Sequence, residues 1–168
     1  MKRRRENKIL HKNKIIIVDD DEAILSSIKD YLTLAGYDVD TAKTGKEAIV
    51  KSKNHFFNLA VLDIKLPDME GTELLTKMHE TRPKMMKIML TGYPDLENAA
   101  KALNKGADAY LIKPIKLQEL QKVIEDKLSQ QQNELKMNQE KIVEYLETRA
   151  QEVDEKKQTE STKKSTKK

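Results

Sequence analysis

Four places in this 168-residue chain carry side chains that together could handle a phosphoryl group. They are the carboxylates of Asp19–Asp21, the carboxylate of Asp63, the hydroxyl of Thr91 and the ammonium of Lys113. Clustered carboxylates repel one another unless a cation neutralises them, and hard oxygen ligands with open positions favour Mg²⁺. A carboxylate can itself attack phosphorus and become an aspartyl-phosphate. Because Asp63 stands alone after an apolar run, we expect it to be the acceptor.

Each place also has an ordinary structural interpretation. An Asp that follows a strand often caps a turn or a helix, and Asp19–Asp21 could be an N-cap with favourable dipole charges. The pairs Thr91-Gly92 and Lys113-Pro114 are typical of turns and loops. The chemical interpretation therefore depends on whether all four places lie at the same edge of the fold.

The elements around these residues alternate between strands and helices. Short apolar or alternating runs predict strands at 15–18, 37–41, 59–62, 85–90 and 107–112. Helical spacing of apolar residues predicts helices at 22–35, 45–53, 72–81 and 95–104, and a long helix from Leu117. This alternation is typical of a parallel sheet with helices on both faces, which binds ligands beyond the carboxyl ends of its strands. All four places lie at such ends.

The composition excludes several other classes of protein. The absence of Cys excludes disulfides, thiolate metal sites and Cys nucleophiles. No apolar run approaches the ~20 residues of a membrane span, and no signal-peptide core follows the basic start, so we expect a soluble, cytoplasmic protein. His11, His55 and His79 have no metal-ligand spacing. The net charge of +4 divides into +6 over residues 1–14, −7 over 15–155 and +5 over 156–168.

Four segments carry a resemblance to a known family. In chain order they are IIIVDDDEAIL, LAVLDIKLPDMEG, IMLTGY and ADAYLIKP. In order and spacing they resemble the receiver domain of two-component response regulators, of the chemotaxis-receiver type, over residues 14–128. The resemblance implies an α/β, flavodoxin-like, doubly wound fold with five parallel strands in the order 2-1-3-4-5. Five helices would accompany the sheet, the last of them extended.

The resemblance also implies the acceptor and its metal. Asp63 would be phosphorylated by a histidine kinase or a phosphotransfer protein. Asp20 and Asp63 would hold Mg²⁺ directly, Asp19 mainly through water, and the backbone carbonyl of Lys65 would complete the protein's ligands. Apart from its own phosphorylation and dephosphorylation, the chain would catalyse nothing.

Lys113, Thr91 and Tyr110 would convert phosphorylation into a change of shape. Lys113 would pair with the phosphoryl oxygens and precede a cis bond to Pro114. Thr91 would move inward to hydrogen-bond one oxygen, and Tyr110 would rotate inward with it. This switch would alter the face around residues 95–124 for contacts with a downstream protein. The alternative interpretation of Tyr110 is a half-buried strand aromatic with no such role.

Two further positions lie next to the implied site. Lys65 and Tyr93 occupy family positions that influence how fast the acyl phosphate hydrolyses, and a bulky Tyr93 could shield the site from water. Surface variation is the alternative interpretation of both. Pro67 and Gly71 match the family's loop after the acceptor.

The segments outside the receiver carry no recognisable output domain. We expect a flexible basic arm at 1–13, a helical, weakly coiled-coil extension at 129–155 and a basic disordered tail at 156–168. Spacings of four and three residues connect a stripe of Ile124, Leu128, Gln131, Leu135, Asn138, Ile142, Tyr145 and Arg149. Output would then proceed through protein contacts or a homodimer.

Two other functions stay open. A phosphatase of the haloacid-dehalogenase type also uses an aspartyl-phosphate, Mg²⁺, a Thr and a Lys, and Asp19-x-Asp21 imitates its opening motif. Ala23, however, departs from that motif, and Asp63 would go unexplained. The second is a DNA-associated protein acting through its basic ends. Without aromatics or a base-reading element we expect neither sequence-specific nucleic-acid binding nor membrane binding.

Overall fold

The computed structural model describes the backbone of residues 12–165, and the side chains of residues 12–151 and 153. Strands and helices alternate as β1 (Lys14–Val18), α1 (Glu22–Leu34), β2 (Asp38–Ala42), α2 (Gly45–Asn54), β3 (Leu59–Leu62), α3 (Gly71–Lys77), β4 (Met86–Thr91), α4 (Leu96–Asn104), β5 (Ala109–Ile112) and α5 (Leu117–Ser165). The chain divides into two compact units, residues 1–129 and 130–168, so the long helix α5 belongs to both. No helix in the described part has the length and hydropathy of a membrane span.

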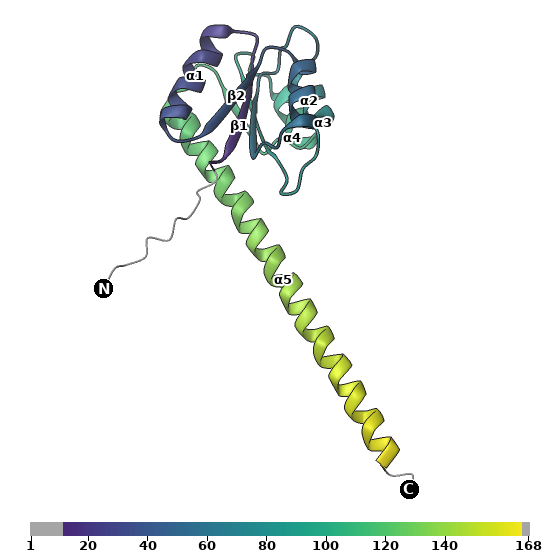
Figure 1. The fold of residues 1–168 in the computed structure, drawn as a ribbon. Helices are drawn as coiled ribbons and strands as arrows, with labels where there is room; N and C mark the ends of the chain where they lie inside the picture. Colours follow the sequence, from purple (N-terminus) through teal and green to yellow (C-terminus); the bar gives the residue numbers. More distant parts are fainter. Residues whose placement is uncertain (1–11, 166–168) are drawn as a thin grey trace, which may run out of the picture. The chain divides into compact units, whose positions relative to one another are not determined.

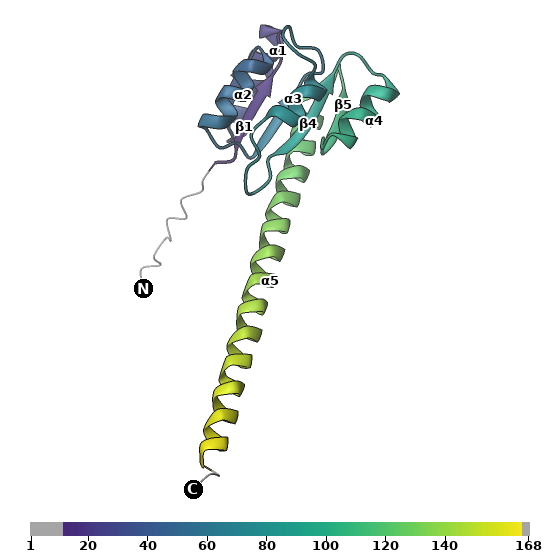
Figure 2. The ribbon, with the colours of Figure 1, turned by 90° about the vertical axis from the view of Figure 1, so that its right-hand side faces the viewer.

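The first unit is built on a single parallel sheet. Its five strands pair in the order β2-β1-β3-β4-β5, which confirms the predicted topology. Helices lie on both faces of the sheet (Figures 1 and 2). Val18 pairs with Ala42 on one side and with Leu62 on the other. The chain therefore leaves β1 and β3 at the same level, and this level carries the candidate residues.

Each face of the sheet has its own hydrophobic core. On one face, Ala48 of α2, Leu74 of α3 and Ala102 of α4 pack against β1, β3 and β4. On the other face, α1 and the first turns of α5 pack through side chains such as Leu32 and Leu120. Strands buried on both faces need unbroken apolar runs, which is why Ile15–Val18 and Leu59–Leu62 lack alternation.

Several predicted boundaries differ from the structure, and three of these differences have a clear local cause. The helix predicted at 72–81 ends at Lys77, because Met78 is already extended while its side chain stays buried. The strand predicted at 107–112 begins at Ala109, since Ala107 still hydrogen-bonds the end of α4 across Gly106, whose φ is +98°. The strand predicted at 37–41 begins at Asp38 for the same reason, because Gly36 with φ +100° closes α1.

The long helix α5 corrects the prediction for the tail. The sequence predicts disorder from Lys156, whereas α5 continues through Ser165. Residues 115–168 contain no Gly or Pro to end the helix, and Lys, Glu and Gln have favourable helix propensities. Most of the predicted basic arm and residues 166–168 lie outside the described residues.

Candidate functional site

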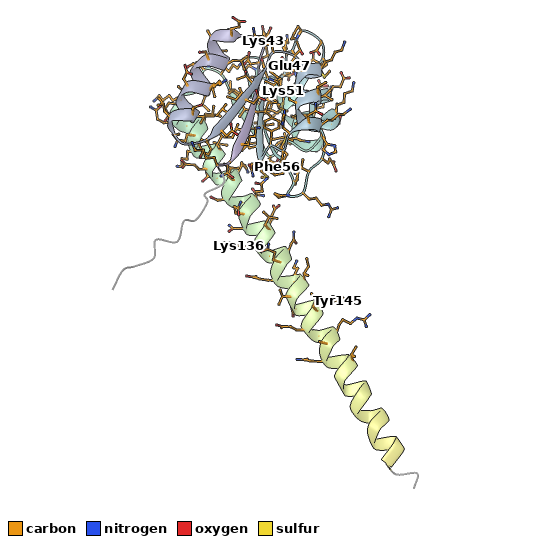
Figure 3. The ribbon with its side chains drawn as sticks, in the orientation of Figure 1. Lys43, Glu47, Lys51, Phe56, Lys136 and Tyr145 are labelled. Carbon is orange, nitrogen blue, oxygen red and sulfur yellow. The ribbon has the colours of Figure 1, made fainter. Side chains whose placement is uncertain are left out.

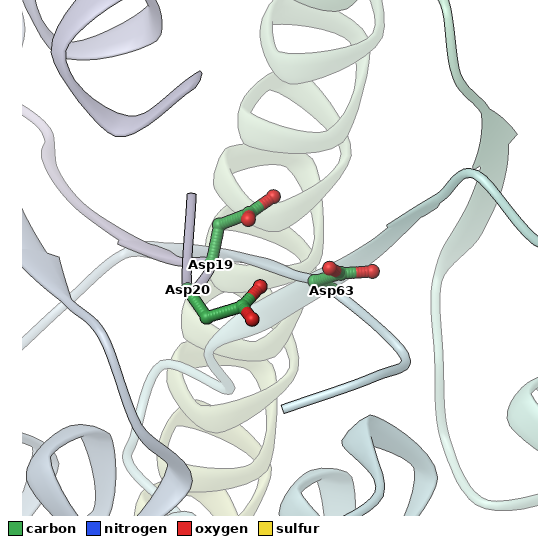
Figure 4. Close-up of side chains that lie close together, drawn as sticks. All are labelled: Asp19, Asp20 and Asp63. Carbon is green, nitrogen blue, oxygen red and sulfur yellow. The ribbon is translucent and has the colours of Figure 1, made fainter. Parts of the chain in front are cut away.

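The candidate residues meet where the strands end. Asp19 follows β1, Asp63 follows β3, Thr91 is the last residue of β4 and Lys113 follows β5. Asp19, Asp20 and Asp63 each place one carboxylate oxygen so that the three atoms lie within 4.8 Å of one another (Figure 4). Parallel pairing in this register is what brings residues 44 positions apart in sequence into one acidic cluster. We call these three residues the acidic cluster.

Lys113 reaches the acidic cluster from β5. Its Nζ lies 2.5 Å from Oδ2 of Asp19 and 3.4 Å from Oδ2 of Asp63. Burial alone would lower the pKa of Lys113, but the hydrogen bond and charge of Asp19, with the charge of Asp63, hold that pKa above its ordinary value. Lys113 is therefore a firmly protonated cation beside two carboxylates. The bond from Lys113 to Pro114 is cis, as is that from Arg82 to Pro83.

Asp63 is a buried carboxylate whose two oxygens have different surroundings. Its backbone N–H donates to the carbonyl of Val18, which ties the end of β3 to β1. Burial raises the pKa of Asp63, and the charge of Asp19 adds to that effect, while Lys113 opposes it. Oδ1 is shielded from solvent and has no hydrogen bond of ordinary geometry, although the backbone of Lys65 lies near the carboxylate. A buried, unsatisfied oxygen beside two other carboxylates suits a hard cation.

Asp21 takes a different role from its two neighbours. Its Oδ1 accepts hydrogen bonds from the N–H groups of Ala23 at 2.9 Å and Ile24 at 3.2 Å, so Asp21 is the N-cap of α1. Its own N–H donates to Oδ1 of Asp19 at 2.9 Å. The capping interpretation is therefore correct for Asp21, while Asp19 and Asp20 belong to the acidic cluster. A mechanism that needs Asp19 and Asp21 as a catalytic pair has no support in this geometry.

The loop after Asp63 packs closely against the end of β3 and is tied to the start of α2. Gly71 lies so close to Asp63 that a Cβ there would come within 2.0 Å of the Asp63 carbonyl oxygen. Asp68 accepts hydrogen bonds from the N–H groups of Gly45 at 2.8 Å and Lys46 at 2.9 Å, which joins the loop to the start of α2. These bonds lower the pKa of Asp68 although desolvation opposes them. Sequence reasoning missed this role, because a Pro-Asp pair indicates only a turn.

The remaining candidates have contacts of their own outside the acidic cluster. Thr91 is fully buried, and its hydroxyl accepts a hydrogen bond from the Tyr93 N–H at 3.1 Å. Tyr110 is half-buried against the core on the α2–α4 face, and its shielded hydroxyl has no hydrogen bond of ordinary geometry despite the nearby Asp95. Lys65 and Tyr93 are both exposed, with the Lys65 Nζ 3.9 Å from the centre of the Tyr93 ring.

Comparison with known proteins gives consistent results. The family model for the response regulator receiver domain matches residues 15–125. A receiver domain protein of Methanospirillum hungatei, described as CheY-like, superposes with a TM-score of 0.71 at 54% identity, over 73% of this chain and 98% of that chain. The beryllofluoride-activated NtrC4 receiver domain dimer superposes with a TM-score of 0.66 at 36% identity, over 70% of this chain and 98% of that one. The regulatory protein VanRB of Enterococcus faecalis is 36% identical over 112 residues, which are 67% of this chain but 50% of that protein.

Proposed function

The chain belongs to the response regulator receiver domain family of two-component systems, and on that premise we propose how its own residues accept and use a phosphoryl group. It spans about half the length of curated relatives such as VanRB. We propose that it acts in the cytoplasm with a histidine kinase or a phosphotransfer protein as donor.

Asp63 is the proposed nucleophile. One of its carboxylate oxygens forms a bond to phosphorus while the bond between phosphorus and the donor histidine nitrogen breaks, and that nitrogen leaves with the electron pair. The observation that carries this assignment is the buried Asp63 Oδ1, which has no hydrogen bond of ordinary geometry, beside a protonated Lys113. Phosphorylation would add about one to two negative charges to an already acidic site.

The acidic cluster is the proposed magnesium site. Asp19, Asp20 and Asp63 would hold the ion, with the backbone carbonyl of Lys65 as a fourth protein ligand. When bound, Mg²⁺ supplies the positive charge that lets carboxylates and a phosphoryl group share one site. Lys113 contributes a second positive charge from the side of β5, and its contacts with Asp19 and Asp63 position it for the phosphoryl oxygens.

Thr91 and Tyr110 form the proposed switch. The Thr91 hydroxyl accepts from the Tyr93 N–H, which leaves its own proton for a phosphoryl oxygen. The Tyr110 hydroxyl lacks a hydrogen bond of ordinary geometry in its present position. A second ring position in which the hydroxyl gains a hydrogen bond would therefore be close in free energy to the present one. The face that would change carries exposed apolar side chains at Leu96, Leu103 and Ile112, which suits contact with a downstream protein.

Chemical phosphorylation tests the assignment directly. The full chain is incubated with Mg²⁺ and a small phosphodonor such as phosphoramidate, and the mass added to the intact protein is measured. We expect the mass of one phosphoryl group, lost when EDTA is added before the donor and absent in Asp63→Asn. Asp30→Asn, an exposed carboxylate on α1, is the matched control and should be labelled normally. Labelling of Asp63→Asn at the normal rate and stoichiometry would show that Asp63 is not the acceptor.

A further inference from the structure

The second unit of the chain exposes an apolar stripe that the receiver chemistry does not use. Within α5, Ile142, Val143, Tyr145, Leu146 and Val153 are each between 49% and 60% exposed. Figure 3 shows Tyr145 projecting from this helix. The first part of the stripe predicted from sequence is not available to a partner, because Ile124, Leu128 and Gln131 are buried. Association through this stripe therefore has to use its part from Leu135 onward.

The half-buried Leu135 and exposed side chains after it follow a heptad seam that differs from the predicted one. Steps of four and three residues connect Leu135, Gln139, Ile142, Leu146, Arg149 and Val153. This seam replaces the predicted Asn138 and Tyr145 with Gln139 and Leu146, and it gains Val153. The opposite side of the helix carries Glu140, Lys141, Glu144, Glu147 and Thr148, so charge is concentrated away from the seam.

The seam has the same pattern from both ends. In order, its residues are apolar, polar, apolar, apolar, polar and apolar, and the pattern is symmetric about position 144. An antiparallel copy of the same helix would therefore place Leu135 opposite Val153 and Ile142 opposite Leu146. A surface that complements itself through a two-fold axis is what an isologous dimer requires.

The charge of Arg149 favours an antiparallel over a parallel pairing of the two helices. In a parallel, in-register pair the two Arg149 guanidinium groups would meet in one layer of the seam, which is unfavourable for like charges. In the antiparallel pair Arg149 lies opposite Gln139, whose amide oxygen accepts hydrogen bonds and carries no charge. Close to the two-fold axis, Val143 would meet its copy on one flank and Tyr145 its copy on the other, without a charged pair.

We propose that residues 135–153 form an antiparallel two-helix dimer with a second copy of this chain, in which each helix leaves the seam beyond Val153, because Gln131 and Leu128 of the other copy are already buried. The segment contains 19 residues and is about 28 Å long at ~1.5 Å per residue. It offers less contact area than a standard stable interface of about 800 Å² per partner, so the dimer forms reversibly and depends on concentration. This inference concerns the second unit alone and does not depend on the proposed phosphoryl chemistry.

The absence of Cys allows a direct test of direction in the full-length chain. Leu135→Cys and Val153→Cys are oxidised separately and as a mixture in which one variant carries a mass tag. The antiparallel dimer predicts a disulfide only between the two variants, whereas a parallel pair predicts disulfides within each variant alone. Glu140→Cys mixed with Thr148→Cys is the matched control, because these positions lie at one level of the same pair but face away. Self-crosslinking, or crosslinking no better than this control, overturns the proposal.

The strength of association gives a second test. Sedimentation equilibrium over a wide concentration range should show a reversible monomer–dimer equilibrium for the parent chain. Leu146→Lys should weaken the association about tenfold or more, since it places a charge in the seam. Thr148→Lys makes the same change on the opposite side and should leave the association within about twofold. A parent chain that stays monomeric at every accessible concentration would refute the dimer, and would leave the stripe for a partner of another kind.

Discussion

Single residues in the acidic cluster have different environments although their side chains are identical. Asp63 and Asp19 are buried and contact Lys113, whereas Asp20 is exposed and has no such contact. Because Asp19 and Asp63 are buried, their carboxylates affect the stability of the fold as well as the proposed binding of a cation. The cost of removing each carboxylate should therefore separate into an effect on stability and an effect on the cation.

Asp20 is the residue for which these effects separate cleanly. Asp20→Asn removes an exposed charge, so the stability of the metal-free protein should change by no more than about 0.5 kcal/mol. Magnesium affinity should fall at least about tenfold, because a proposed direct carboxylate ligand is lost. Thermal unfolding measured against Mg²⁺ concentration reports both quantities, since a ligand of the native state raises the midpoint. A midpoint that rises with Mg²⁺ as it does in the parent would remove Asp20 from the ligand set.

The pair of Lys65 and Tyr93 is a candidate shield for the phosphorylated acceptor. The ammonium of Lys65 lies over the Tyr93 ring, and both side chains are exposed two residues after Asp63 and Thr91 in sequence. If this cover limits the access of water to the acyl phosphate, Tyr93→Ala should shorten the phosphoprotein half-life several-fold. Decay after removal of the donor, followed by intact mass, measures it. Tyr145→Ala on the distant part of α5 serves as the control, and an unchanged half-life in Tyr93→Ala would exclude the shield.

The strands and helices were largely predictable because their apolar patterns are local. Buried runs such as Ile15–Val18 indicate parallel strands, and the order of segments indicates which residues follow them. Helix ends were less predictable, because Met78 leaves α3 while remaining in the core. The contact between Asp68 and the start of α2 was not predictable, since it joins residues 22 and 23 positions apart through backbone geometry.

At the scale of single elements, Gly71 at the start of α3 packs directly against the backbone that follows β3. A methyl group at this position would come within 2.0 Å of the Asp63 carbonyl oxygen, and no flexible side chain could move to relieve the clash. Gly71→Ala should lower the free energy of unfolding by about 2 kcal/mol or more and slow phosphorylation by displacing Asp63. Urea unfolding provides the measurement. Gly92→Ala is the control, because its Cβ would meet nothing within 4 Å, and equal destabilisation of both would contradict the packing argument.

Lys87 in β4 should make the free energy of unfolding depend on pH in the alkaline range. Its buried Nζ donates to the Leu75 carbonyl of α3, and burial lowers its pKa. Between that lowered pKa and the ordinary value of 10.5, the unfolded chain binds more protons than the folded chain at this site. The parent should therefore gain stability relative to Lys87→Met as pH rises from neutrality toward that value.

Urea unfolding of both proteins at a series of pH values measures this difference. Lys29→Met, which removes an exposed lysine of α1, should differ from the parent by a constant amount. A stability of the parent relative to Lys87→Met that stays constant, or that falls as pH rises, would mean that burial does not govern the protonation of Lys87.

At the scale of the whole molecule, the basic excess lies in different segments of the chain from the residues of the proposed phosphoryl chemistry. The net charge of +4 hides a body of −7 over residues 15–155, in which the acidic cluster lies, while most of the basic excess is at the two ends. The receiver family accounts for residues 15–125, and the seam begins at the half-buried Leu135 and is exposed from Gln139 onward. Phosphate acceptance and self-association should thus be separable by shortening the chain.

A chain that ends after Asn133 tests this separation. It keeps both cores of the sheet, including Leu128, and also the buried Gln131, but it loses the whole seam. We expect phosphorylation by a small donor within about twofold of the parent rate, because every residue that contacts Asp63 is retained, and a monomer at all concentrations. Intact mass and sedimentation equilibrium provide the two readouts on the same sample. A large loss of phosphorylation in a folded fragment would mean that the removed part of α5 helps to position Asp63. A dimer that persists in the fragment would mean that self-association occurs through the receiver and not through the seam.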